Sequence, residues 1–67
     1  SSAASDVYKR QELIGQMKPM YRAPLRLLAM GYTNREIAKS LGLTDEVVRM
    51  RLFRGRKLLW KELNSRE

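Results

Sequence analysis

The chain has 67 residues and a net charge of +7, which is enough for one small, strongly basic domain. It contains no Cys and no His, so disulfides, thiolate metal sites and the commonest general base are excluded. No apolar run approaches the roughly 20 residues of a membrane span, and the first residues lack the apolar stretch of a secretory signal. We therefore expect a cytoplasmic domain that is not an enzyme and uses no cofactor, catalytic residue or metal.

Residues 1–11, SSAASDVYKRQ, begin with small and polar side chains and show no sustained hydrophobic period. This composition predicts a disordered leader. The string also resembles translated sequencing-adapter read-through, in which case it is not native and an N-terminal part of the protein is missing. We expect the folded domain to occupy residues 12–67.

From residue 12 onwards, apolar residues recur at helical spacing. The pattern predicts one helix over about residues 8–17 and a second over about residues 19–30. Pro19 suits the first turn of the second helix, because an N–H group would have no helical partner there. Pro24 lies inside the same helix, so the sequence predicts either a kink or a later start.

A third helix is bounded by clear start and stop signals. Gly31 is expected to end the helix before it, since glycine takes positive φ without strain. Thr33 or Asn34 then caps the third helix, and Gly42 ends it. Thr44 caps a fourth helix, predicted over about residues 45–63, whose first turn carries two acidic side chains.

The third and fourth helices together predict a helix-turn-helix within an all-α fold of four helices. Such a unit needs a small residue where the helices cross and a glycine in the turn, which Ala38 and Gly42 supply. The alternative is a plain helical hairpin in a small bundle. The residues assigned to the core of this unit are Ile37, Ala38, Leu41, Leu43, Val48, Leu52, Gly55 and Leu59.

The fourth helix has a second, basic side. At about 100° per residue, five side chains fall opposite or beside its core positions. An aromatic ring among cations suits the major groove of DNA, where arginines bind guanine or phosphates and apolar groups contact thymine methyls. The alternative is a solvated basic surface that favours solubility. The five residues are Arg49, Met50, Phe53, Arg54 and Lys57.

Two further residues of this helix have more than one interpretation. Glu46 can accept a hydrogen bond from cytosine, but we favour a role in stabilising the positive start of the helix. Trp60 can contact a partner, but we expect it to pack in the core under the first helix.

Three motifs in order carry a resemblance to a known family: MKPMYRAPLRLL, GYTNREIAKSLG and EVVRMRLFRGRKLL. Over about residues 12–63 the chain resembles region four, the C-terminal promoter-recognition domain of extracytoplasmic-function sigma factors. It departs from the family pattern at Val47, Met50 and Gly55, where Thr, Ser and Ala are usual. The first two departures affect the DNA sequence preferred, not the mode of binding.

The resemblance implies a role for each matching position in binding the promoter −35 element. Three residues of the fourth helix would face bases, two would lie near the DNA backbone, and the start of the third helix would contact phosphates. The expected DNA-binding set is Thr33, Arg35, Thr44, Glu46, Arg49, Met50, Phe53, Arg54 and Lys57.

The resemblance also implies protein partners. The family docks this domain on the β flap of bacterial RNA polymerase during transcription initiation, and anti-sigma factors often mask it. The family's core-polymerase-binding domain is not among these residues. Two alternatives remain: a LuxR-type DNA-binding domain of a response regulator, and a basic amphipathic module that binds a protein or a membrane surface.

Overall fold

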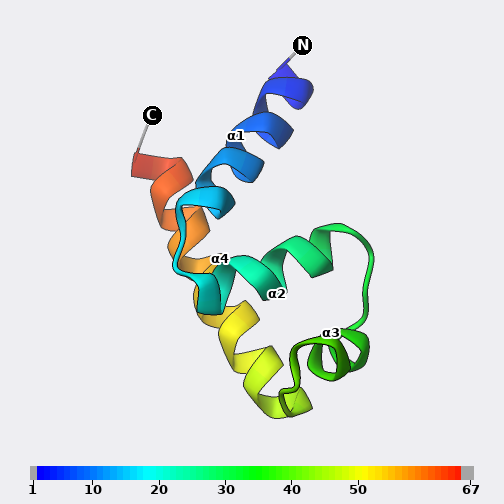
Figure 1. Cartoon of the computed structure of the whole chain (residues 1–67). Coiled ribbons are helices and arrows are strands. Elements are labelled where there is room, and N and C mark those ends of the chain that lie inside the picture. Colours follow the sequence, from blue (N-terminus) through cyan, green and yellow to red (C-terminus); the bar gives the residue numbers. More distant parts are fainter. Residues whose placement is uncertain (1, 66–67) are drawn as a thin grey trace.

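The computed structural model describes the backbone of residues 2–65 and the side chains of residues 7–65. Within them the chain forms four α-helices and no strand (Figure 1). These helices are α1 (Ser2–Gln16), α2 (Pro19–Ala29), α3 (Asn34–Leu41) and α4 (Asp45–Ser65). The predicted all-α class and the four helices are confirmed. Residue 1 of the predicted leader and residues 66–67 of the predicted domain lie outside the described residues.

The first helix is longer than the sequence predicted. In the part of the predicted leader that the structure describes, residues 2–11 belong to α1. Two neighbouring side chains near the end of α1, Leu13 and Ile14, are buried against the rest of the domain. Extending a helix from a packed turn costs little, and no proline interrupts α1.

The second helix begins at Pro19, as predicted, and continues through Pro24. The predicted later start is therefore wrong. Pro24 has no N–H to donate to the carbonyl four residues before it. Its ring is nevertheless one of the most deeply buried side chains, so packing against the core offsets the missing hydrogen bond.

Two glycines in left-handed conformation end α2 and α3, as the sequence predicted. Gly31 has φ +96° and Gly42 has φ +67°. Beyond Gly31, the N–H of Tyr32 donates to the carbonyl of Leu27 at 3.1 Å, and an equivalent bond of 2.8 Å closes the end of α3. A residue with a Cβ atom would be strained at either position.

The starts of α3 and α4 are capped by threonines. The N–H of Glu36 donates to Oγ1 of Thr33 at 3.2 Å, and the N–H of Thr33 donates to Oε1 of Glu36 at 2.9 Å. Thr33, and not Asn34, is thus the cap, and the pair forms a capping box. Oγ1 of Thr44 accepts the N–H of Val47 at 3.1 Å. These local bonds fix where the two helices of the unit begin.

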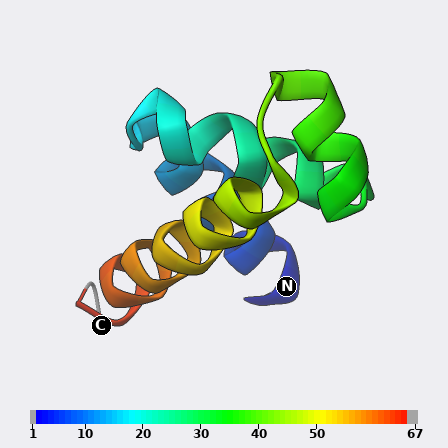
Figure 2. The ribbon, with the colours of Figure 1, turned by 90° about the horizontal axis from the view of Figure 1, so that it is seen from below.

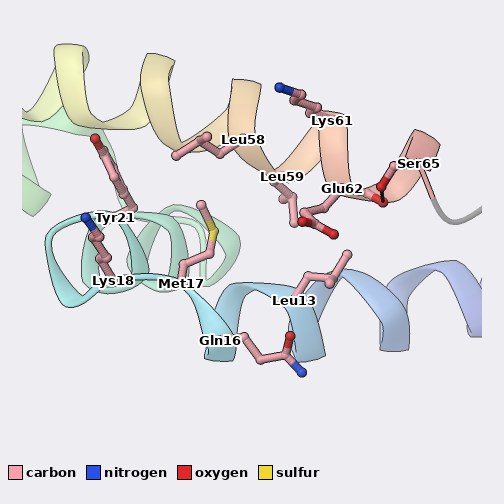
Figure 3. Close-up of a pocket in the computed structure, with 10 residues that line it drawn as sticks. All are labelled: Leu13, Gln16, Met17, Lys18, Tyr21, Leu58, Leu59, Lys61, Glu62 and Ser65. Carbon is pink, nitrogen blue, oxygen red and sulfur yellow. Dashed lines mark hydrogen bonds between the residues drawn. The ribbon is translucent and has the colours of Figure 1, made fainter.

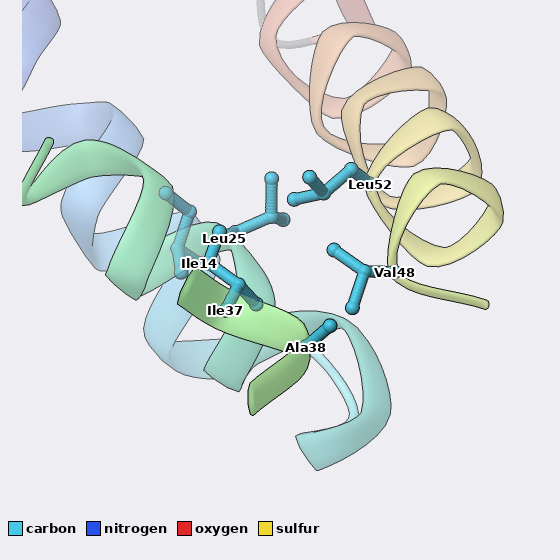
Figure 4. Close-up of a cluster of buried hydrophobic side chains, with 6 residues drawn as sticks. All are labelled: Ile14, Leu25, Ile37, Ala38, Val48 and Leu52. Carbon is cyan, nitrogen blue, oxygen red and sulfur yellow. The ribbon is translucent and has the colours of Figure 1, made fainter. Parts of the chain in front are cut away.

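All four helices contribute to one apolar core (Figure 4). Ile37 and Val48 are completely inaccessible to solvent, and Ala38 and Leu52 lie beside them. These four residues confirm the core predicted for the helix-turn-helix. Leu41, Leu43 and Leu59 pack at its margin and are only partly buried, whereas Ile14, also in the core, had not been predicted.

The long helix α4 packs against each of the other three helices. α3 lies beside its beginning, α2 crosses it and α1 lies near its end (Figure 1 and Figure 2). The α2 crossing is close at Gly55, where an added Cβ atom would stand 3.1 Å from Cδ1 of Leu25. We call Val48, Leu52, Gly55 and Leu59 the inner face of α4, because they meet the other helices. The opposite side is left uncovered.

Candidate nucleic-acid interface

The uncovered side of α4 carries the side chains that the sequence placed there. Phe53 is 64 % exposed and Met50 is 46 % exposed, although both are large and apolar. Three cations beside them are exposed as well. We call these five residues the outer face of α4: Arg49, Met50, Phe53, Arg54 and Lys57. Their predicted position on the helix is confirmed. The surface they form combines three positive charges with two exposed apolar side chains.

The ring of Phe53 already has a cation above it. Nζ of Lys57 lies 5.5 Å from the ring centroid, one helical turn along α4. At an exposed site such a contact contributes about 0.5–1 kcal/mol. This small energy holds Lys57 over the ring, and a phosphate close to the ammonium group is enough to compensate for its loss.

An ion pair joins the beginnings of α3 and α4. Nε of Arg35 lies 3.9 Å from Oδ2 of Asp45, with side chains 88 % and 63 % exposed. A pair this long and this exposed contributes little to stability. Its value is geometric, because it shows that the start of α3 lies beside the start of α4. Arg35, at the start of α3, is thus next to the first residue of α4.

Three other predicted site residues stabilise the starts of α3 and α4. The Oγ1 atoms of Thr33 and Thr44 accept backbone N–H groups in the two caps, while their O–H groups can still donate. Glu46 is exposed in the first turn of α4, where its charge stabilises the positive end of the helix. Each of them therefore has a structural role that does not require a ligand.

The capping box also affects one carboxyl group. The backbone N–H of Thr33, followed by the Thr33 side chain, lowers the pKa of Glu36 from its ordinary value of 4.5. Glu36 is exposed, so burial scarcely opposes this effect. The capping box consequently favours the ionised form of Glu36.

Trp60 does not pack in the core, so that prediction is wrong. Its side chain is 69 % exposed. Seven residues, about two helical turns, separate it from Phe53, and the two rings therefore project from the same side of α4. α1, which was expected to cover Trp60, packs against the side of α4 that carries Leu59. The spacing from Phe53 was the signal in the sequence that identifies this position.

A groove of about 630 Å³ lies between α1, the start of α2 and the last third of α4 (Figure 3). Leu13 of α1 and Leu59 of α4 point toward one another across it, whereas Lys61 points away. The remaining apolar lining comes from Met17, Tyr21 and Leu58. Because Leu59 belongs to the inner face of α4, this groove and the outer face are distinct surfaces.

Other kinds of site have no counterpart in the residues that the structure describes. No group of three or more acidic side chains gathers where a metal ion could be held. None of the described helices combines the length and the apolar character needed to cross a bilayer. The exposed cations and large apolar side chains of the outer face make the basic surface of α4 the strongest candidate for a binding site.

Comparison with known proteins gives the same assignment. The family model described as sigma-70, region 4, matches residues 11–59, well over half of the chain. No curated protein and no solved structure matches the chain. Region 4 is a helix-turn-helix domain that binds DNA and is not catalytic. Sigma factors use it, together with RNA polymerase, to contact the −35 element of a promoter. With its helix-turn-helix, its capped α3 and α4 and its matched residues, the chain belongs to the sigma-70 region 4 family.

Proposed function

We propose that this chain is the region 4 domain of an extracytoplasmic-function sigma factor, and that it reads the −35 element by placing α4 in the major groove. One observation carries the proposal: the outer face of α4 exposes Phe53 and Met50 among cations, while the inner face is buried. DNA can bind such a surface, because its phosphates attract the cations and its thymine methyl groups make apolar contacts. The LuxR-type alternative has no such support from the family comparison.

Three residues of the outer face are assigned to bases. Arg49 can bind guanine through two parallel hydrogen bonds, and Met50 and Phe53 can contact thymine methyl groups. All three are exposed within the first three turns of α4. Arg49 is the principal specificity residue in this scheme, since a two-bonded contact discriminates between bases by about 1–3 kcal/mol.

The remaining residues are assigned to the DNA backbone. Arg54 and Lys57 flank the base-reading positions, and Lys57 would leave the Phe53 ring for a phosphate. Thr33 and Arg35 offer an O–H, a guanidinium and the positive start of α3 to a second phosphate. The ion pair between Arg35 and Asp45 is weak enough to open when that phosphate arrives.

Thr44 and Glu46 have smaller parts in the proposed complex. Thr44 keeps its cap on Val47 and can donate its O–H to the DNA backbone. Glu46 can accept a hydrogen bond from cytosine N4, but its charge also opposes a nearby phosphate. We therefore assign Glu46 chiefly to the start of α4.

The domain positions RNA polymerase and performs no chemistry. One module of this size buries roughly 600–1,000 Å² on DNA, so that its free affinity is modest. Tethering to polymerase in the cytoplasm raises its effective concentration at the promoter. We assign the groove beside α1 to the β flap of polymerase, because it joins apolar and polar side chains, as protein interfaces do, and lies away from the outer face. An anti-sigma factor would act by covering either surface.

The direct test is a titration of the domain with a duplex carrying a −35 element of the family and with a scrambled duplex. At several salt concentrations, we expect the −35 duplex to bind more tightly. The logarithm of its association constant should fall with the logarithm of salt at a slope that corresponds to roughly four to six phosphate contacts. Equal binding of both duplexes would contradict base reading, and no binding at low salt would contradict the DNA function altogether.

A further inference from the structure

The exposed indole of Trp60 extends the outer face beyond the residues assigned so far. The helix rises about 1.5 Å per residue, which puts Trp60 about 10 Å further along the axis than Phe53 and about 16 Å beyond Arg49. Trp60 also lies just past the residues that the family model matches. Neither the resemblance nor the family comparison assigns it a role.

The surroundings of Trp60 are basic. Arg56, Lys57 and Lys61 lie within four residues of it on α4, and all three are exposed. They fall on the same side of the helix or beside it. A large ring among three cations is therefore presented to solvent, on a surface continuous with the proposed DNA contacts. The charge of this surface favours a polyanion over an apolar protein groove.

The dimensions of DNA indicate which part of it Trp60 would meet. The major groove is about 12 Å wide. If Arg49 and Phe53 contact base edges, a side chain about 10 Å further along a straight helix reaches the edge of the groove, where the sugar–phosphate backbone lies. The indole N–H is a donor that suits a phosphate oxygen, and the ring can pack on a deoxyribose.

We propose that Trp60 is a positioning residue that binds the sugar–phosphate backbone of DNA at the edge of the major groove. This inference rests on the proposed function. The contact does not depend on the DNA sequence. It fixes how far α4 enters the groove, while Arg49, Met50 and Phe53 read the bases.

Trp60 is the only tryptophan of the chain, so tryptophan emission, excited at wavelengths that the three tyrosines do not absorb, reports on this side chain alone. The experiment titrates the domain with unlabelled −35 duplex while tryptophan emission and its quenching by acrylamide are recorded. In parallel, the anisotropy of a labelled duplex measures binding itself. We expect the emission to change and the acrylamide quenching to fall, with the same midpoint as the anisotropy. Binding seen by anisotropy without any change at Trp60 would overturn the inference and leave the proposed function intact.

Two variants give a second readout. We expect Trp60→Ala to lower the affinity about fivefold to tenfold on −35 and scrambled duplexes alike, and Trp60→Phe to lower it less, since the ring remains. Tyr8→Ala is the matched control, because Tyr8 of α1 is 78 % exposed and has no assigned contact. Circular dichroism should show unchanged helicity in all three. A loss for Trp60→Ala no larger than for Tyr8→Ala would overturn the inference, as would a loss on the −35 duplex only. Absence of DNA binding by the unaltered domain would end both proposals.

Discussion

The two faces of α4 obey different physical rules although they share one helix. The inner face consists of apolar or small residues that touch three other helices, and it holds the domain together. The outer face carries larger side chains, among them Phe53 and Met50, and leaves them in solvent. Burial of the first set stabilises the fold, whereas the exposed second set contributes little to it.

This difference separates stability from binding at the level of single residues. A substitution on the inner face should change the free energy of unfolding and reduce DNA binding only through loss of structure. A substitution on the outer face should leave the fold unchanged and reduce DNA binding directly. Three variants on α4 test this separation and a fourth tests the cap of α3, beginning with the largest expected effect.

Leu52→Ala should produce the largest effect on stability. Leu52 is 4 % exposed in the shared core, and truncation of a buried leucine costs about 2–5 kcal/mol. For a domain of this size that is a large part of the total. Urea unfolding followed by circular dichroism measures the change. A loss below about 1 kcal/mol would show that the inner face is less essential than its burial indicates.

Arg49→Ala should reverse this pattern. We expect its free energy of unfolding to stay within about 0.5 kcal/mol of the unaltered domain, because the side chain is exposed. Affinity for the −35 duplex should fall by about 1–3 kcal/mol, with one base position relaxed. Anisotropy with −35 and scrambled duplexes measures both. An equal loss on the two duplexes would reassign Arg49 to the backbone.

Lys57→Ala should weaken binding to every sequence to the same extent. Removal of one phosphate contact should flatten the salt slope by about one unit. Lys9→Ala, which removes an exposed lysine from α1, is the control for net charge and should leave the slope nearly unchanged. If the two variants have the same slope, Lys57 remains over the Phe53 ring in the complex and does not reach a phosphate.

Glu36→Gln tests the cap that begins α3 and should have the smallest effect. The pKa of Glu36 is lower in the folded than in the unfolded chain, so the unfolded state takes up the proton first as the pH falls. The contribution of Glu36 is therefore present above its unfolded pKa and is lost as the pH falls through the folded one. Urea unfolding at about pH 6 and about pH 3 should show a smaller loss on acidification for the variant. Identical losses would mean that the carboxylate does not support the cap.

Local signals in the sequence were sufficient to predict much of this structure. Gly31, Gly42 and Thr44 act through bonds within a few residues, so each marked a helix boundary correctly. The inner and outer faces of α4 followed from helical periodicity alone. The DNA-binding role of the outer face is a proposal that this periodicity made possible.

Features that depend on tertiary packing were harder to predict. Residues 2–11 continue in one helix with the buried Leu13 and Ile14, a connection that composition does not reveal. The ion pair of Arg35 with Asp45 joins two helices whose relative placement only the fold sets. Trp60 was misplaced because a tryptophan is usually buried, although its spacing from Phe53 indicated otherwise.

The most direct test of the central claim is to map the DNA contacts on the domain by NMR. Backbone amide shifts would be followed while the −35 duplex is added, with the scrambled duplex as the reference. We predict that the largest changes lie on the outer face of α4 and at the start of α3, with residues lining the groove beside α1 little affected. Changes concentrated at Leu13, Tyr21 and Leu58 instead would place the DNA in that groove and would contradict the division of α4 into a structural face and a binding face.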